Sequence, residues 1–306
     1  MREKLKITLS FFCIMLFLPY VCAVLFHNVG ASGQTFGTMV SPQQPVEDTI
    51  EQLLIGVLAA QISPEYELET YKAQAVLART GLYKMKKEQG AESISVEKLS
   101  QYMSMGEMER TYGSEKREKF YQQLSTAIKE TKGVTIRYQG NYIEPFFHAV
   151  SSGKSRNGNR AFHSKEYGYL QEVENSYDIL APDYVTVIWL SKQEMADKIN
   201  ASIHSNISGD KILDAIKILN RDEANYVTEL TIGGKKIAGE EFRHFLDLNS
   251  SCFYLNSIED NIQITTKGLG HGIGMSQYNA NELAKEGKTY EEILTYYFKD
   301  IELVSE

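Results

Sequence analysis

The chain has 306 residues, with 32 lysines and arginines against 40 aspartates and glutamates, and a formal net charge of −8. This length exceeds that of a mini-domain that depends on disulfides, and a hydrophobic content of 42% argues against wholesale disorder. The acidic balance argues against non-specific nucleic-acid binding, because a basic surface supplies most of the affinity in that class of protein.

The N-terminal segment has the pattern of a membrane anchor. Residues 1–6 contain three basic side chains and one acidic, and residues 7–26, ITLSFFCIMLFLPYVCAVLF, contain no charge. Twenty helical residues span about 30 Å, the thickness of a hydrocarbon core, and flanking basic residues favour the cytoplasmic side. We therefore predict that residues 1–29 form a cytoplasmic stub and a transmembrane signal-anchor. A cleaved signal peptide ending near Ala31-Ser32-Gly33 is the alternative.

The rest of the chain is expected outside the cytoplasm. Residues 30–46 are rich in Gly, Ser, Pro and Gln, a composition typical of a flexible tether. Residues 1–6 contribute a net charge of +2 and residues 7–46 contribute none, so the remaining residues sum to −10. The sequence thus predicts a single-pass protein of the cell membrane with an acidic extracytoplasmic domain at residues 47–304.

Residues 47–131 have a helical pattern. Apolar side chains in residues 47–60 recur with the three- and four-residue spacing of one helix face, and Pro64 disfavours helix at the residue before it. A second helix is expected at residues 65–87. Residues 95–131 are charged and rich in Met and Tyr, and further helices are expected there with a break near Gly113.

From Gly133 onward the pattern changes to strands and turns. The expected strands are residues 134–138, 142–150, 184–190, 225–232, 235–237, 252–255 and 261–266. Capping-box spacings at Ser191/Glu194 and Thr289/Glu292 predict the starts of two helices, and a further helix is expected at residues 274–286. The predicted fold class is α+β: a helical N-terminal portion packed with a sheet-rich body, preceded by one transmembrane helix.

Cysteine usage predicts a domain without disulfides. Cys13 and Cys22 lie in the membrane segment, so Cys252 has no partner within the domain. Because its neighbour Phe253 is apolar, we expect Cys252 to be a buried, inert thiol.

Two long motifs resemble one protein family. Residues 54–61 read LIGVLAAQ and are followed by ETYKAQAVLART at 69–80; residues 268–280 read GLGHGIGMSQYNA and are followed by AKEGKTYEEIL at 284–294. Shorter matches are SSGKS at 151–155 and GEEFR at 239–243. These segments resemble stage II sporulation protein D and its amidase-modifier relatives, the SpoIID/LytB family, in the same order from residue 47 to 304.

The resemblance implies a function at the cell wall. Members of this family are membrane-anchored, exported proteins that act on peptidoglycan. Its sporulation members cleave glycan strands as lytic transglycosylases during engulfment, beside a peptidoglycan amidase and a multispanning membrane protein. The expected partners are therefore peptidoglycan glycan strands, the membrane, an amidase and that membrane protein, and no nucleic acid.

Gln61 departs from the family pattern at the catalytic position. Active relatives carry a Glu there, which protonates the glycosidic oxygen and then takes a proton from the sugar's 6-hydroxyl. An amide does neither at neutral pH, and general acid–base help is worth roughly 10²–10⁴ in rate. Three interpretations stay open: a glycan-binding scaffold with weakened or no cleavage, an enzyme that uses Glu65 or Glu144 instead, and another function on the same fold.

The resemblance also suggests residues that bind glycan or assist catalysis. The catalytic candidates are His271 and Gln61, which stands at the position of the family Glu. The binding candidates are Lys72, Arg79, Ser151, Ser152, Gly153, Lys154, Gly270, Gly272 and Gln277. Each has a structural alternative: Arg79 paired with a Glu, Lys72 solvated, and residues 270–274 forming a tight turn. Because the wall is acidic, we expect four cations to gather in a basic cleft: Lys72, Arg79, Lys154 and Arg156.

No metal or cofactor is expected. His148 lies near Ser151, where some relatives have been seen with zinc, but no Cys accompanies it. There is no Walker motif and no Gly-x-Ser-x-Gly, so a phosphate- or acyl-transfer enzyme is poorly supported.

Overall fold

The computed structural model describes residues 50–90 and 93–306, so the predicted membrane segment and tether lie outside the described residues. Residues Glu47–Glu306 form one unit by their internal contacts. Within the described ranges, no helix is both long enough and apolar enough to cross a membrane. The described part mixes helices with several small sheets, which confirms the α+β class.

The N-terminal helices form the first core. Helices α2 (Ile50–Gln61) and α3 (Leu68–Gln89) pack against each other and against α5 (Ser114–Glu130), while α4 (Met105–Tyr112) packs on α5. The predicted apolar stripe of α2 is buried in this core. The helix α2 ends at Gln61, close to the boundary that Pro64 predicts.

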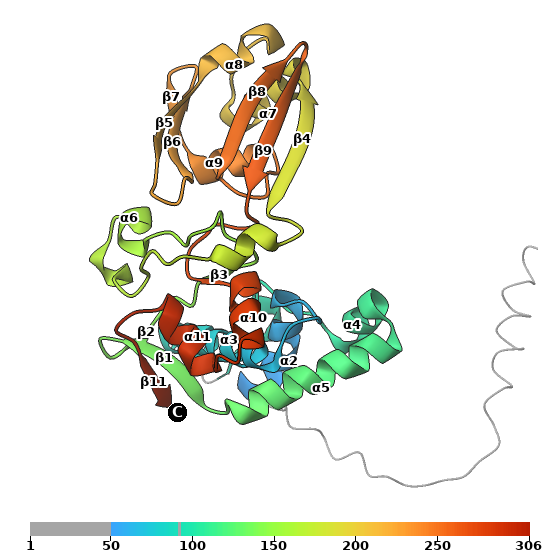
Figure 1. Ribbon diagram of the computed structural model, residues 1–306, viewed down its shortest axis with the longest axis vertical. Helices are drawn as coiled ribbons and strands as arrows, with labels where there is room; N and C mark the ends of the chain where they lie inside the picture. The colour runs from blue at the N-terminus through green and yellow to red at the C-terminus, as the bar shows by residue number, and fades with distance from the viewer. Residues whose placement is uncertain (1–49, 91–92) are drawn as a thin grey trace, which may run out of the picture. The chain divides into compact units, whose positions relative to one another are not determined.

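The C-terminal helices return to cover α3. Helices α10 (Gln277–Lys285) and α11 (Tyr290–Tyr297) both pack on α3, as Figure 1 shows. A long-range hydrogen bond fixes the start of α3: the Glu67 N–H donates to Asn281 Oδ1 of α10 over 2.8 Å. The two ends of the described chain therefore share one helical layer and one hydrophobic core.

Small sheets border this helical layer. Strand β1 (Val134–Tyr138) pairs antiparallel with β2 (Asn141–Tyr142) and with β11 (Glu302–Ser305), which the sequence did not reveal. The single strand expected at residues 142–150 is wrong. Pro145 has no N–H to donate, and the segment contains only β2 and the short β3 (Phe147–His148), which pairs parallel with β10 (Met275–Ser276).

A sheet-rich module occupies residues 185–267 and has its own core. One sheet has the order β4-β9-β8 and the other β5-β6-β7. Their strands are β4 (Val185–Ser191), β5 (Ile216–Arg221), β6 (Val227–Ile232), β7 (Lys235–Ala238), β8 (Phe253–Ile258) and β9 (Asn261–Lys267). The module's helices are α7 (Lys192–Ile203), α8 (Ile212–Ala215) and α9 (Gly239–Phe245). The predicted capping box of Ser191 and Glu194 begins α7.

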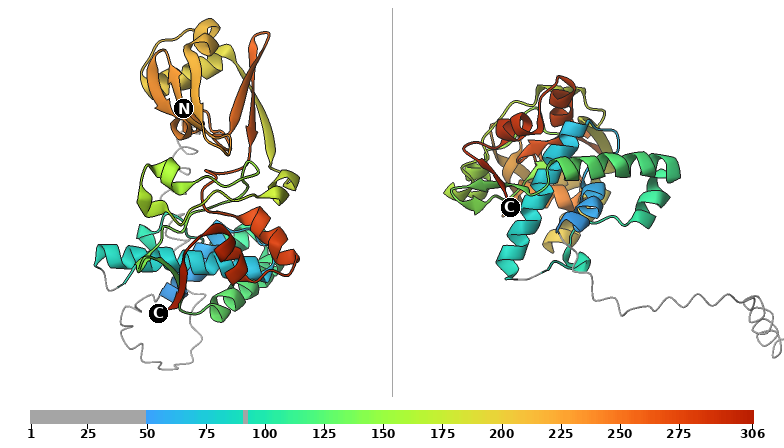
Figure 2. Two further views of the ribbon diagram at one scale, coloured as in Figure 1. Left: turned by 60° about the vertical axis from the view of Figure 1, so that its left-hand side comes forward. Right: turned by 90° about the horizontal axis from the view of Figure 1, so that it is seen from below.

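A turn-rich segment joins the module to the helices (Figures 1 and 2). It includes the short helix α6 (Gly158–Phe162) and lies between residues 143 and 184. The module's two ends lie side by side, because the Gly268 N–H donates to Tyr184 O over 2.8 Å. Next to this point, Val150 and Leu269 exchange backbone hydrogen bonds.

Candidate functional site

Gln61 lies where two surface cavities meet. A cavity of about 410 Å³ runs from Gln61 along α3 to Glu144 and Phe147, and a second of about 460 Å³ runs from Gln61 past Pro64 to Lys116. Gln61 is therefore at the centre of a hollowed strip of surface and not at its margin.

A third cavity extends this strip. Its volume is about 480 Å³, and it shares the side chains of Lys84, Glu88 and Glu144 with the first cavity. Four tyrosines line it: Tyr138, Tyr142, Tyr167 and Tyr169. We call the three cavities together the Gln61 groove. An elongated groove with aromatic walls is suited to a chain-like polar ligand that offers flat apolar faces.

A chain of three amides fixes the orientation of the Gln61 side chain. Gln277 Nε2 donates to the backbone oxygen of Gln61 over 2.8 Å and to Gln74 Oε1 over 3.2 Å. Gln74 Nε2 then donates to Gln61 Oε1 over 3.0 Å. Because a backbone oxygen only accepts, the direction of the whole chain is set. The amide oxygen of Gln61 is therefore the atom held by the protein, and its Nε2 has no partner within the described part of the chain.

The turn after Gln61 is held by a tyrosine from the next helix. The hydroxyl of Tyr71 donates to Ser63 O over 2.9 Å and accepts from the Tyr66 N–H over 3.1 Å. Burial raises the pKa of Tyr71 to about 12, so the hydroxyl keeps its proton. Hydrogen bonds from α3 and α10 thus hold both the end of α2 at Gln61 and the turn that follows it.

Both carboxylates named as substitutes line the Gln61 groove, one on each side of Gln61. Glu144 forms an ion pair with Lys84 of α3. Glu65 is largely exposed and pairs with Lys116 over 2.6 Å, and the hydrogen bond from Lys116 lowers the pKa of that carboxyl. A lowered pKa opposes the role of general acid, which needs a carboxyl that keeps its proton near neutral pH.

Arg79 lies away from the groove. The side chain has no exposed surface, and its Nε and Nη2 donate to both oxygens of Glu51 over 2.6 and 2.9 Å. Its remaining N–H groups bond to Thr131 Oγ1 and to the backbone oxygens of Ile128 and Val134. A fully enclosed guanidinium has no donor left for a sugar, so the expectation that Arg79 binds glycan is wrong. The structural alternative, in which Arg79 pairs with a Glu, is what the structure shows.

Lys72 lies on the same side of α3, facing the end of α5. Its Nζ is 2.6 Å from carboxylate oxygens of both Glu69 and Glu130. These two hydrogen bonds outweigh burial and raise the pKa of Lys72. Lys72 is thus neither free nor solvated in this structure.

Residues 151–154 lie at the junction with the sheet-rich module. The Ser151 N–H donates to the buried carboxylate of Asp178, and Ser152 bonds to Tyr226 and Ala224. Gly153, next in the turn, donates its N–H to Ser151 Oγ, and Lys154 forms ion pairs with Glu172 and Glu174. The polar atoms of this turn are used within the protein, and none of its residues lines the Gln61 groove.

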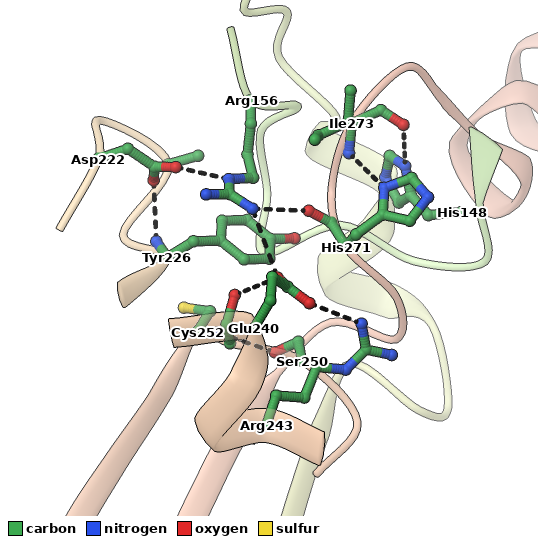
Figure 3. A network of polar contacts seen from close by, with 12 residues as sticks. His148, Arg156, Asp222, Tyr226, Glu240, Arg243, Ser250, Cys252, His271 and Ile273 are labelled. Carbon is green, nitrogen blue, oxygen red and sulfur yellow. Dashed lines mark hydrogen bonds and ion pairs between the residues drawn. The ribbon is translucent and has the colours of Figure 1, made fainter. Parts of the chain in front are cut away.

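Arg156 is the centre of a buried polar network at the same junction (Figure 3). Its Nε donates to Asp222 over 2.6 Å, and its Nη1 lies within 3.4 Å of Glu240 and 3.2 Å of His271 O. The guanidinium also covers the ring of Tyr226. The expected basic cleft is therefore wrong: Lys72 and Arg79 lie on α3, Lys154 and Arg156 lie at the junction, and each of the four is paired with a carboxylate.

The glycine-rich turn at 270–274 is packed tightly against its surroundings. A Cβ at Gly272 would lie 2.4 Å from the Tyr226 ring, and one at Gly270 would lie 2.8 Å from the Cβ of His148. The helix α10 that follows is capped by its own Ser276, whose Oγ also donates to Asp178. The N–H groups of Tyr278 and Asn279 at this helix start are used within the protein, because they donate to Ala149 O and to Ser276 Oγ.

His148 of β3 and His271 of this turn face each other, with ring centroids 5.9 Å apart. His148 Nδ1 donates to Ile273 O, and His271 Nδ1 accepts from the Ile273 N–H, each over 3.1 Å (Figure 3). Burial lowers the pKa of His148 to about 3 and that of His271 to about 4, so both rings are neutral. Across the described ranges, no three His, Cys, Asp or Glu side chains converge to hold a metal.

Sequence reasoning did not single out Gln74 or the groove tyrosines. Gln74 lies within a motif that carries the family resemblance, and a fully buried amide on an apolar helix face is a signal that could have found it. Tyr142 and Tyr167 come from a short strand and a 3₁₀ turn, and only the fold brings them to one cavity. Of the predicted binding residues, Gln277 alone contacts Gln61 directly.

Comparison with known proteins shows which family and which relatives this chain is similar to. The family described as Stage II sporulation protein matches residues 44–138. Stage II sporulation protein D of Bacillus subtilis (strain 168) is 28% identical over 336 residues, covering 98% of this chain and 96% of that protein. The chain is thus similar to proteins of the SpoIID family. The stage II sporulation protein D of Bacillus amyloliquefaciens is 28% identical, over 83% of this chain and 74% of that one.

A further relative has a different name. The Amidase enhancer of Bacillus subtilis (strain 168) is 24% identical over 82% of this chain, which corresponds to 40% of that longer protein. The stretch that matches the family profile includes Gln61 and Gln74, whereas Gln277 lies beyond it. The amide chain therefore joins the matched segment to the C-terminal motif.

Proposed function

We propose that this protein is a membrane-anchored, extracytoplasmic SpoIID-like protein that binds peptidoglycan glycan strands during cell-wall remodelling in sporulation. It binds the strand in the Gln61 groove and cleaves it weakly or not at all. The names of its relatives support a role in sporulation and an association with an amidase. The uncharged segment at residues 7–26 supports the membrane anchor.

The observation that carries this proposal is the position and orientation of Gln61. The groove extends on both sides of it, as the path of a polymer requires, and its Nε2 is free to donate a hydrogen bond to a bound sugar oxygen. An amide N–H donates a hydrogen bond but does not transfer its proton at neutral pH. Binding is therefore retained while the acid–base step is lost.

The test is the variant Gln61→Glu. Its carboxylate would accept the same hydrogen bond from Gln74 and would restore an acid–base group at the centre of the groove, so we expect release of 1,6-anhydro sugar ends to rise by roughly 10²–10⁴. The measurement is the chromatographic yield of 1,6-anhydro product from purified glycan strands, with strand binding followed in parallel by cosedimentation. Gln61→Met, of similar length without polar atoms, is the control that restores no acid.

Two outcomes would contradict the proposal. Product release by the unaltered protein at the rate of Gln61→Glu would show that a substitute carboxylate works. In that case Glu144→Gln and Glu65→Gln would identify it, and the lowered pKa of Glu65 makes Glu144 the better candidate for an acid. Absence of strand binding by the unaltered protein would show that glycan is not its ligand.

A second candidate function is amidase modification without glycan cleavage. The relative named Amidase enhancer and the loss of the acid at Gln61 favour it. Here the protein would bind the strand and present it to a peptidoglycan amidase. The expected result is a higher amidase rate on intact sacculi when this protein is added, with no such effect on a soluble muropeptide. Equal rates with and without the protein would remove this candidate.

A further inference from the structure

The sheet β4-β9-β8 leaves one face open to solvent. Its inner face carries Ile262 and Ile264 into the core of the module. The side chains that alternate with them point outward, and five large apolar ones among these are exposed: Val185, Val187, Trp189, Tyr254 and Ile258. We call this surface the open sheet face. Trp189 is the chain's one tryptophan, and half of its surface is exposed.

The register of the strands arranges this face in rows. Val187 and Tyr254 lie on either side of Thr265, and Trp189 lies beside Gln263 in the next row. Exposed apolar side chains that form a contiguous patch mark an interaction surface, whereas scattered ones are normal. Aromatic residues in a patch of aliphatic ones are typical of the centre of a protein–protein interface.

The charges at the two ends of the face are opposite. At the end nearest the helices, the guanidinium of Arg221 and the Nζ of Lys267 lie 4.6 and 5.9 Å from the Tyr254 ring centroid. The guanidinium of Arg221 is held by hydrogen bonds to the backbone oxygens of Asn225 and Phe253, so its charge is not paired with a carboxylate there. At the other end, the β8–β9 turn carries Glu259 and the exposed Asp260. Asp260 Oδ1 lies 4.0 Å from Lys192 Nζ, so Glu259 is the acidic side chain of this turn without an ion-pair partner in the described part of the chain. About seven residues of β9 separate these ends, a distance of about 20 Å.

We propose that the open sheet face binds a second copy of this chain, face to face and antiparallel. A two-fold axis through the middle of the face brings the cationic end of each copy to the acidic end of the other, and places Val187 and Trp189 of both copies between them. The middle rows of the face hold Val187, Trp189 and Tyr254 together with the polar Thr265, Gln263 and Asn256. A face with such a middle and oppositely charged ends is complementary to itself under this symmetry. Two packed sheets lie about 10 Å apart, which suits the interdigitation of these side chains.

The size of the face sets the strength of this dimer. Three strands at about 4.8 Å and seven residues at about 3.3 Å give a patch of about 14 Å by about 20 Å. This is small beside the roughly 800 Å² that each partner buries in a standard interface. The dimer is therefore expected to be weak, and its population to depend on protein concentration.

The first experiment measures mass against concentration. Sedimentation velocity of the full chain in density-matched detergent should show a monomer–dimer equilibrium that Val187→Glu shifts at least about tenfold towards monomer. The matched control is Leu219→Glu on β5, because Leu219 and Val187 are both 44% exposed and Leu219 lies on the other sheet. Thermal unfolding of both variants checks that the fold is kept.

The second experiment tests the antiparallel arrangement by exchanging charges. Lys267→Glu and Glu259→Lys should each weaken the dimer, and the double variant should restore it, because the opposed ends are again complementary. A purely structural role for either residue would give no such rescue.

Three results of these two experiments would overturn the proposal. They are a monomer at every concentration, a dimer that Val187→Glu leaves unchanged, and weakened single charge variants without rescue in the double variant. Loss of glycan or amidase binding by Val187→Glu with an unaltered mass would also overturn it, since the face would then belong to another partner. The first three results do not depend on cleavage or strand binding at Gln61.

Discussion

Arg79 illustrates how a cation in a family motif can be structural. It is the largest side chain in the described chain with no exposed surface, and its fork-shaped pairing with Glu51 ties α3 to α2. The hydrogen bonds to Ile128 and Thr131 extend this tie to the end of α5. Sequence alone does not reveal a carboxylate that lies 28 residues earlier in the chain.

We predict that Arg79→Met destabilises the protein by about 3 kcal/mol, because it leaves the Glu51 carboxylate partly buried without its partner. Arg79→Lys should cost less, since it keeps the charge and loses only the fork. Urea unfolding of both variants measures this cost. A loss of strand binding with unchanged stability would instead give Arg79 a role in the ligand site.

Three buried titratable groups near the glycine-rich turn contribute to the response to acid. His148 and His271 have pKa values lowered by burial to about 3 and about 4, so between pH 4 and 6 the unfolded chain binds about two protons more at these sites. Burial raises the pKa of Asp178 to about 6, so at this site the folded chain binds about one proton more over the same range. The histidines contribute stability that is lost as pH falls, and Asp178 contributes stability that is lost as pH rises.

The balance predicts one net proton taken up on unfolding, so these three groups make stability fall by about 1.4 kcal/mol for each pH unit between about pH 6 and pH 4. His271→Gln should bring this slope near zero, whereas Asp178→Asn should roughly double it. Urea midpoints measured at several pH values test this. A slope that is unaffected by either substitution would show that other groups control acid unfolding.

At the scale of elements, prediction succeeded where the signal was local. The strand at 134–138 and the capping boxes of Ser191/Glu194 and Thr289/Glu292 depend on residues within a few positions, and the structure confirms them. It failed where pairing is long-range: β11 forms only because residues 302–305 meet β1. The position of Gln61 at the end of α2 was predictable, but its amide partners Gln74 and Gln277 come from two other helices.

The glycine-rich turn offers a test of close packing between elements. Gly272 has a φ of +74°, and a Cβ there would lie 2.4 Å from the ring of Tyr226, which is fully buried. We predict that Gly272→Ala costs about 1–2 kcal/mol for the backbone conformation and about 1–3 kcal/mol more for the displaced ring. Gly287→Ala is the control, because Gly287 has a φ of +90° with open space around it. Equal losses of stability in the two variants would show that contact with the Tyr226 ring adds no cost at position 272.

At the scale of the whole molecule, the net charge of −8 is not offset by a basic groove. The charged side chains that line the Gln61 groove are Lys84, Lys87, Lys116, Glu65, Glu88, Glu144 and Glu166. Within this set, Lys84 pairs with Glu144 and Lys116 with Glu65. The lysines are therefore largely neutralised, and binding of an acidic wall polymer must rest on stacking and hydrogen bonds.

This balance predicts weak salt dependence of strand binding. Raising the ionic strength from about 0.05 to about 0.5 M shortens the Debye length to a few ångströms, yet the bound fraction should change by less than about twofold, because little net attraction is available to screen. Tyr167→Ala should weaken binding at both salt concentrations, since it removes a stacking surface, and Tyr121→Ala on α5, outside the groove, should not. Glu166→Lys should make binding tighter at low salt and salt-sensitive, because it adds an unpaired cation to the groove. Cosedimentation with purified glycan strands at both salt concentrations measures all four proteins, and a tenfold loss for the unaltered chain at high salt would mean that an electrostatic site elsewhere holds the strand.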